Sequence, residues 1–192
     1  MKIKKVLSII LVSAFGLTAL LAVLNIPVSI KRGVNFQVSC VRMPLYLKIL
    51  DFMDRHYNYK ILTREIINAE DSPRQRVMKI FHWTSENIRP QPSSLPIIDD
   101  HVWHIIVRGY GTSDQSNDVF TTLCNYAGID AFFEFTYTKE ASSTIPLSFV
   151  RIEGEWYVFD VYNQVYFKTL SGDIASLNRI EAGDWYVFNA NY

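Results

Sequence analysis

Two stretches decide the fold of this chain: Gly109–Ala131, GYGTSDQSNDVFTTLCNYAGIDA, and Leu147–Asp160, LSFVRIEGEWYVFD. The first predicts a helix that begins near Ser113, because a small polar residue precedes an apolar pattern of helical period, and a turn at Gly128 follows. The second predicts two strands joined by a turn at Gly154.

In this order and at these spacings, the two stretches resemble the core of the transglutaminase-like superfamily, a branch of the papain-like cysteine hydrolases and acyl transferases. In that family a Gly-x-Cys opens the helix, a histidine begins the next strand, and an aspartate ends the strand after it. The resemblance implies that Ser113 stands at the cysteine position, Leu147 at the histidine position and Asp160 at the aspartate position. It extends from the helix around residues 72–88 to the strand at 165–168.

Two of the three implied catalytic groups are therefore replaced. Leu147 has no proton to exchange, and a serine hydroxyl needs a base even more than a thiol does. The substitutions predict a pseudoenzyme in which Ser113 is the helix N-cap. A surviving Ser113 nucleophile is the alternative. We expect Asp160 to bond the Ser113 hydroxyl or the amides at the helix start.

Other candidate site residues are few. Beside the implied triad positions, a cleft in this place would bind its partner through Ser113, Asp114, Gln115, Trp156 and Asp160. His101 and His104, which follow Asp99 and Asp100, have a spacing that can place two imidazoles on one metal, but no second ligand cluster is visible. His104 is also considered as a replacement base for Ser113. No cofactor is expected.

The amino terminus predicts membrane attachment. Lys2, Lys4 and Lys5 precede an apolar run, Val6–Leu24, which as a helix would be about 28 Å long, enough to cross a bilayer. A cleavable signal peptide is the rival, with a processing site at Ala14-Phe15-Gly16. We favour an uncleaved signal anchor in residues 1–32, with a cytoplasmic N-terminus and an extracytoplasmic domain, periplasmic or extracellular, in residues 33–192.

Net charge and cysteine content limit the classes of function that this chain can have. Residues 33–192 hold 14 Lys and Arg (19 minus five) against 19 Asp and Glu, so their formal charge is −5, which disfavours nucleic acid. Their length suits one domain. Cys40 and Cys124 could form a disulfide outside the cytoplasm, although Cys124 has the position of a small core residue.

The remaining elements predict an α+β domain, with helices packed on an antiparallel sheet. Trp185 lies in a second copy of the Gly-x-Trp-Tyr-Val-Phe motif and is expected to bury against the core in the same sheet. The expected helices cover residues 43–55, 63–69, 73–88, 99–108 and the segment from Ser113, and the expected strands cover 131–138, 147–152, 155–160 and 165–169.

Three functions fit these observations. The first is a membrane-anchored, non-catalytic binding or scaffold module for a peptide, a glycan or an envelope-assembly protein. The second is a Ser113-dependent acyl transferase or amidase whose base comes from elsewhere. The third is a packing subunit of a membrane complex, which would expose an apolar patch.

Overall fold

The computed structural model describes residues 2–99, 101–137 and 144–189. Asp100 and Thr138, which belong to two of the expectations above, lie outside these ranges. The helices are α1 (Lys2–Leu24), α2 (Leu45–Ile66), α3 (Pro73–Asn87), α4 (Val102–Arg108), α5 (Ser113–Tyr126) and α6 (Leu177–Glu181). The strands are β1 (Pro27–Val34), β2 (Gln37–Pro44), β3 (Arg89–Pro90), β4 (Ile98–Asp99), β5 (Tyr110–Gly111), β6 (Ala131–Tyr137), β7 (Thr144–Ile152), β8 (Glu155–Asp160), β9 (Val165–Lys168) and β10 (Tyr186–Asn189).

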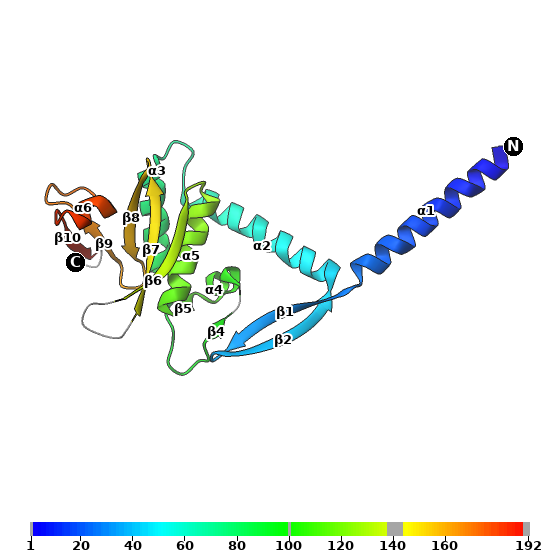
Figure 1. Cartoon of the computed structure of the whole chain (residues 1–192), viewed down its shortest axis with the longest axis horizontal. Coiled ribbons are helices and arrows are strands. Elements are labelled where there is room, and N and C mark those ends of the chain that lie inside the picture. The colour runs from blue at the N-terminus through cyan, green and yellow to red at the C-terminus, as the bar shows by residue number, and fades with distance from the viewer. Residues whose placement is uncertain (1, 100, 138–143, 190–192) are drawn as a thin grey trace.

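A five-stranded antiparallel sheet forms one layer of the domain, in the order β10-β9-β8-β7-β6. Helix α5 packs on β6 and β7, and α3 packs beside α5 (Figure 1). The α+β architecture predicted from the sequence is therefore confirmed.

An aromatic cluster joins the helices to this sheet. Phe81 of α3, Phe120 of α5 and Phe159 of β8 are fully buried, and their ring centroids lie 5.4–6.1 Å apart. Cys124 is buried in the same core, as expected. Cys40 is exposed on β2, and both cysteines are free thiols in the structure.

The pleat of β7 decides which side chains can meet α5. Pro146, Ser148, Val150 and Ile152 are buried, whereas the residues between them are more exposed. Because side chains alternate across a strand, the buried set faces the helices and the other set faces away from them.

Local sequence signals set the start of α3 as predicted. Ser72 is its N-cap and accepts from the backbone N–H of Gln75 at 3.3 Å, and the Gln75 side chain accepts from the Ser72 N–H at 2.9 Å. Pro73 at the first helical position completes this capping box.

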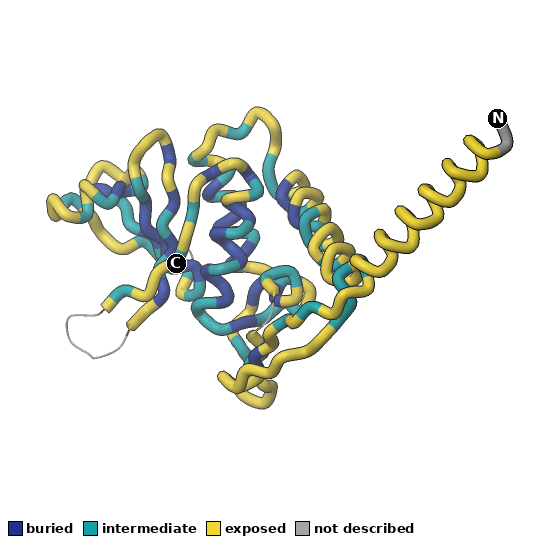
Figure 2. Tube along the Cα trace, turned by 45° about the vertical axis from the view of Figure 1, so that its right-hand side comes forward, coloured by how far each residue is buried: buried dark blue, intermediate teal, exposed yellow. Residues whose placement is uncertain are grey.

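Helix α1 projects from the domain and is exposed along its described side chains (Figure 2). Its segment Lys4–Leu24 has a mean hydropathy of 2.6 and is long and apolar enough to cross a membrane. The expected division after Arg32 falls inside β1, because the strand starts at Pro27, three residues after α1 ends.

Two elements between residues 27 and 66 differ from expectation. Strands β1 and β2 form a hairpin, closed by a turn in which Asn35 and Phe36 both have positive φ values. Helix α2 runs on to Ile66 and absorbs most of the separate short helix expected at residues 63–69.

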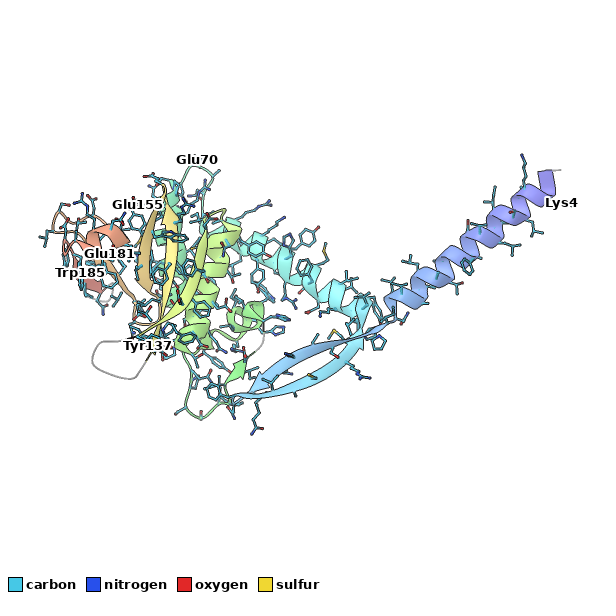
Figure 3. All side chains as sticks on the ribbon, viewed as in Figure 1. Lys4, Glu70, Tyr137, Glu155, Glu181 and Trp185 are labelled. Atoms are coloured by element: carbon cyan, nitrogen blue, oxygen red, sulfur yellow. The ribbon has the colours of Figure 1, made fainter. Side chains whose placement is uncertain are left out.

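The repeated motif near the C-terminus does place β8 and β10 in one sheet, as expected. The expected burial of Trp185 is wrong. Its side chain is 38% exposed and rests on the ring of Phe167, at the end of the domain opposite Lys4 (Figure 3). Trp185 directly precedes β10, the last strand of the sheet, which pairs with β9.

Candidate functional site

Ser113 is the first residue of α5, and the N-cap of this helix is Thr112 rather than Ser113. The Thr112 N–H donates to Oε1 of Gln115 at 3.2 Å, and the Thr112 hydroxyl donates to Asp114. The sequence predicted Ser113 as the N-cap, so the observed N-cap lies one residue earlier in the chain. Within the described residues, the Ser113 hydroxyl makes no hydrogen bond.

Asn117 connects the start of α5 to β7. Its side chain is fully buried, and Nδ2 donates to the carbonyl oxygen of Ser113 at 2.8 Å and to that of Pro146 at 3.2 Å. Its Oδ1 accepts from the Ser148 hydroxyl at 2.5 Å. One amide therefore holds the backbone at the cysteine position against the two residues that flank Leu147. Asn117 was not predicted as a site residue, because its only signal in the sequence is a polar side chain within an apolar helical face.

Gln115 is part of the structural framework. It is buried, its Nε2 donates to the Ile98 carbonyl at 2.6 Å, and its Oε1 accepts from Arg108 Nη2 at 2.9 Å. Gly111 makes this packing feasible, because a Cβ there would lie 3.0 Å from Gln115 and 3.3 Å from Ile105. Buried and bonded through both Nε2 and Oε1, Gln115 supports the start of α5.

Two of the implied triad positions, Leu147 and Asp160, lie on the face of the sheet that α5 leaves uncovered. Leu147 belongs to the set of β7 side chains that face away from α5, and it pairs with Glu134 of β6. Asp160 lies directly beyond the last β7–β8 pair, Ser148 with Phe159, and shares the face of Leu147. One-residue alternation thus places both side chains on the face opposite to Ser148, which bonds Asn117 of α5.

The expected bond from Asp160 to Ser113 or to the start of α5 is wrong. Asp160 accepts from the Asn163 backbone N–H at 3.1 Å and from Asn163 Nδ2 at 2.7 Å. These bonds stabilise the turn after β8, as aspartate commonly does in turns.

Trp156 lies with Phe132 and Phe149 on the sheet face that α5 leaves uncovered. Phe132 stacks on Phe149 with ring centroids 5.2 Å apart and meets Trp156 edge to face, also at 5.2 Å. The five expected binding residues are therefore divided: Ser113, Asp114 and Gln115 are on the helix side, and Trp156 and Asp160 are on the other face.

The four histidines lie in three places. His56 Nδ1 is 2.9 Å from the Tyr126 hydroxyl, and His82 is exposed on α3. His101 and His104 are exposed, with ring centroids 6.0 Å apart. None of the four is hydrogen-bonded to Ser113 within the part of the chain that the structure describes.

A cavity of about 370 Å³ lies between β1 and α4. Its polar lining comes from Lys31, Arg32, Asp99, His101 and His104. Among residues 2–99, 101–137 and 144–189, no three His, Cys, Asp or Glu side chains form a group that could hold a metal.

Asp118 has the most perturbed carboxyl group near α5. Burial, together with the charges of Asp114 and Asp99, raises its pKa to about 6. Burial also raises the pKa of Tyr59 on α2 to about 12. The sequence signal for Asp118 was its position one turn after Asp114, which places two acids on one helix face.

Comparison with known proteins agrees with this architecture. Residues 60–190 match the transglutaminase-like superfamily. No curated protein matches the chain closely enough to count as a relative.

Two crystal structures are similar. A candidate cysteine protease from Cytophaga hutchinsonii has 17% identity and a TM-score of 0.46, and the match covers 69% of this chain and 46% of that one. A candidate protease from Parabacteroides distasonis has 14% identity and a TM-score of 0.45, covering 54% and 23%. The chain thus spans less than half the length of either protein. The family match covers more than half of the chain, which therefore belongs to the transglutaminase-like superfamily.

Proposed function

We propose that this protein is a membrane-anchored, non-catalytic binding module for a peptide, a glycan or an envelope-assembly protein outside the cytoplasm. The observation that carries the proposal is the buried Asn117 amide between Ser113 and β7. This amide fixes the backbone at the implied nucleophile position to β7, and the strand residue that it brings there, between Pro146 and Ser148, is a leucine rather than a histidine.

The surroundings of Ser113 support the same proposal. A general base must come within about 2.6–3.2 Å of the proton that it accepts. Among the described residues no histidine, lysine or carboxylate bonds the Ser113 hydroxyl, and Leu147 and Asp160 lie on the other face of the sheet. Ser113 at the first position of α5 receives the field of the helix dipole, which is too weak to ionise a serine at neutral pH.

Helix α1 is the proposed anchor. It is apolar and exposed, and its basic residues precede the apolar segment, so the positive-inside rule places the N-terminus in the cytoplasm. The domain would then face the periplasm or the cell exterior.

The cavity between β1 and α4 is our candidate for the partner site. Lys31, Arg32 and Asp99 supply charges of both signs, and the imidazoles of His101 and His104 add polar groups. Convergent polar groups in a concave site suit a peptide or a sugar.

Two assays on the full chain in nanodiscs test the proposal. We expect no turnover of amide, ester or acyl-transfer substrates that depends on Ser113, and we expect Lys31→Glu with Arg32→Glu to abolish cross-linking to an envelope partner that the unaltered chain captures. Turnover that Ser113→Ala abolishes would instead establish the serine acyl transferase or amidase. Capture that the double variant leaves unchanged would exclude the cavity as the binding site.

One observation favours the third function, a packing subunit of a membrane complex. Several large apolar side chains of α2 are exposed, as that hypothesis requires. What covers them is argued next.

A further inference from the structure

Helix α2 carries an apolar stripe on the side that the rest of the domain leaves uncovered. This outer stripe consists of Tyr46, Leu50, Met53, Tyr57 and Ile61, whose exposures range from 37% to 60%. Steps of three and four residues place these side chains on one face of the helix.

The opposite face of α2 is packed against the domain in the second half of the helix. The Tyr59 ring lies 5.6 Å from that of Trp103 on α4 and 4.9 Å from that of Tyr126 on α5. Thr63, one turn further along, is also buried. Helix α2 thus has two apolar faces. Within the described residues the second face is covered from His56 onward, whereas Phe52 in the first half is exposed.

The first turn of α2 is held beside the end of α1. The Leu45 N–H donates to the Ile26 carbonyl at 2.9 Å, and Pro27 pairs with Pro44 at the open end of the hairpin. The chain therefore leaves α1, runs out along β1 and returns along β2 to the same point before α2 begins. In Figures 1 and 2 the uncovered side of α2 faces the side from which α1 projects.

We propose that the outer stripe lies on the surface of the lipid bilayer that holds α1. This inference rests on the proposed membrane anchoring. The apolar face of an interfacial helix enters the boundary between headgroups and acyl chains by about 5–10 Å, and tyrosines such as Tyr46 and Tyr57 are favoured at that depth.

The charged residues beside the outer stripe favour a lipid surface over a protein partner with a strongly acidic or strongly basic surface. Asp54 borders the outer stripe on one side and Lys60 borders it on the other, so neither an acidic nor a basic partner is selected. The outer stripe begins beside the apolar surface of α1, and this continuity favours the bilayer over a protein partner. A stripe that starts beside the end of a membrane span is placed at the interface by the span itself.

This contact would fix the orientation of the whole domain. With α1 as the only attachment, the domain could swing about Asn25 and Ile26; with α2 on the bilayer, the domain has a second contact and one preferred face toward the membrane. The sheet edge with α6 and Trp185 would then point away from the membrane (Figure 3).

Fluorescence quenching by spin-labelled lipids tests the proposal. The full chain with Cys40→Ser is placed in nanodiscs of phosphatidylcholine and phosphatidylglycerol, and Cys124, which is buried, stays unlabelled. An environment-sensitive dye is attached through Leu50→Cys on the outer stripe, Lys48→Cys as the matched exposed control on the other side of α2, or Val12→Cys within α1. Leu50 is 60% exposed, so its replacement should not disturb folding.

We expect strong quenching at position 12 and at least about twofold more quenching at position 50 than at position 48. Quenching at position 12 with equal, weak quenching at positions 48 and 50 would overturn the bilayer contact and leave the anchoring intact. No quenching at position 12 would refute the anchoring itself, and the bilayer contact with it. Disulfide-linked dimers through Leu50→Cys, or its cross-linking to another membrane protein, would show that a protein covers the stripe.

Discussion

The Ser148 hydroxyl donates a 2.5 Å hydrogen bond to Oδ1 of Asn117, and both side chains are fully buried. This bond joins the first turns of α5 to β7. Because Nδ2 of the same amide bonds the carbonyls of Ser113 and Pro146, the two stretches that define the family are tied together by one side chain.

Replacement of Asn117 by alanine should destabilise the domain by about 2–4 kcal/mol, because the Ser148 hydroxyl and two carbonyls would lose a buried partner. Urea denaturation of the detergent-solubilised full chain, followed by tryptophan fluorescence, measures this loss. Asn178→Ala is the matched control: it removes an exposed bond to Glu155 and should cost less than about 1 kcal/mol. Equal losses in the two variants would show that the Asn117 bridge does not stabilise the fold.

The close approach at Gly111 makes a second prediction. A methyl group there would lie 3.0 Å from Gln115 and would displace it from Arg108 and Ile98, so Gly111→Ala should cost about 1–3 kcal/mol. Gly16→Ala adds the same methyl group where no atom lies within 4 Å and should leave the denaturation midpoint unchanged. A stable Gly111→Ala protein would mean that the Gln115 network can move at little cost.

Asp118 should make the domain more stable in mild acid. Its pKa is about 6 in the folded protein against an ordinary value of 3.8, so the folded state holds the proton more tightly. Stability should therefore fall as the pH rises from about 4 to 6, by up to about 2 kcal/mol after allowance for the partial exposure of Asp118.

Asp118→Asn should remove this dependence and stabilise the protein at pH 7. Denaturation midpoints measured from about pH 4 to about pH 7, a range that includes the expected transition, compare the two proteins. Asp71 acts in the opposite direction, because its hydrogen bond to Lys79 lowers its pKa, but its contribution is lost only below 3.8. Parallel pH profiles for the variant and the unaltered protein would contradict the assignment to Asp118.

The sequence predicted the elements whose signals are local. Strand β8 has the expected bounds because Gly154 turns the chain before it, and α3 begins where Ser72 and Pro73 form a cap. The hairpin of β1 and β2 was missed because most of its side chains on both faces are exposed, so no buried face imposes a regular alternation. Helix α2 was predicted too short because its apolar residues lie on two faces, which weakens the helical period.

For the implied triad positions, the sequence indicated the elements but not the side of the sheet on which each side chain lies. Motif spacing located Ser113, Leu147 and Asp160 in adjacent elements, but the side of the sheet on which a residue lies depends on strand register, which tertiary packing sets. The roles of Asn117 and Gln115 depend on partners 31 and 17 residues away, which no local pattern reveals.

Covalent labelling of Ser113 tests the central claim most directly. The full chain in nanodiscs, with a known serine hydrolase in the same tube, is incubated with a fluorophosphonate and analysed by intact-protein and peptide mass spectrometry. The account predicts that the hydrolase is labelled while Ser113 carries no adduct, because no base activates its hydroxyl. A stoichiometric adduct on Ser113, absent from Ser113→Ala, would contradict the account and identify an active serine enzyme.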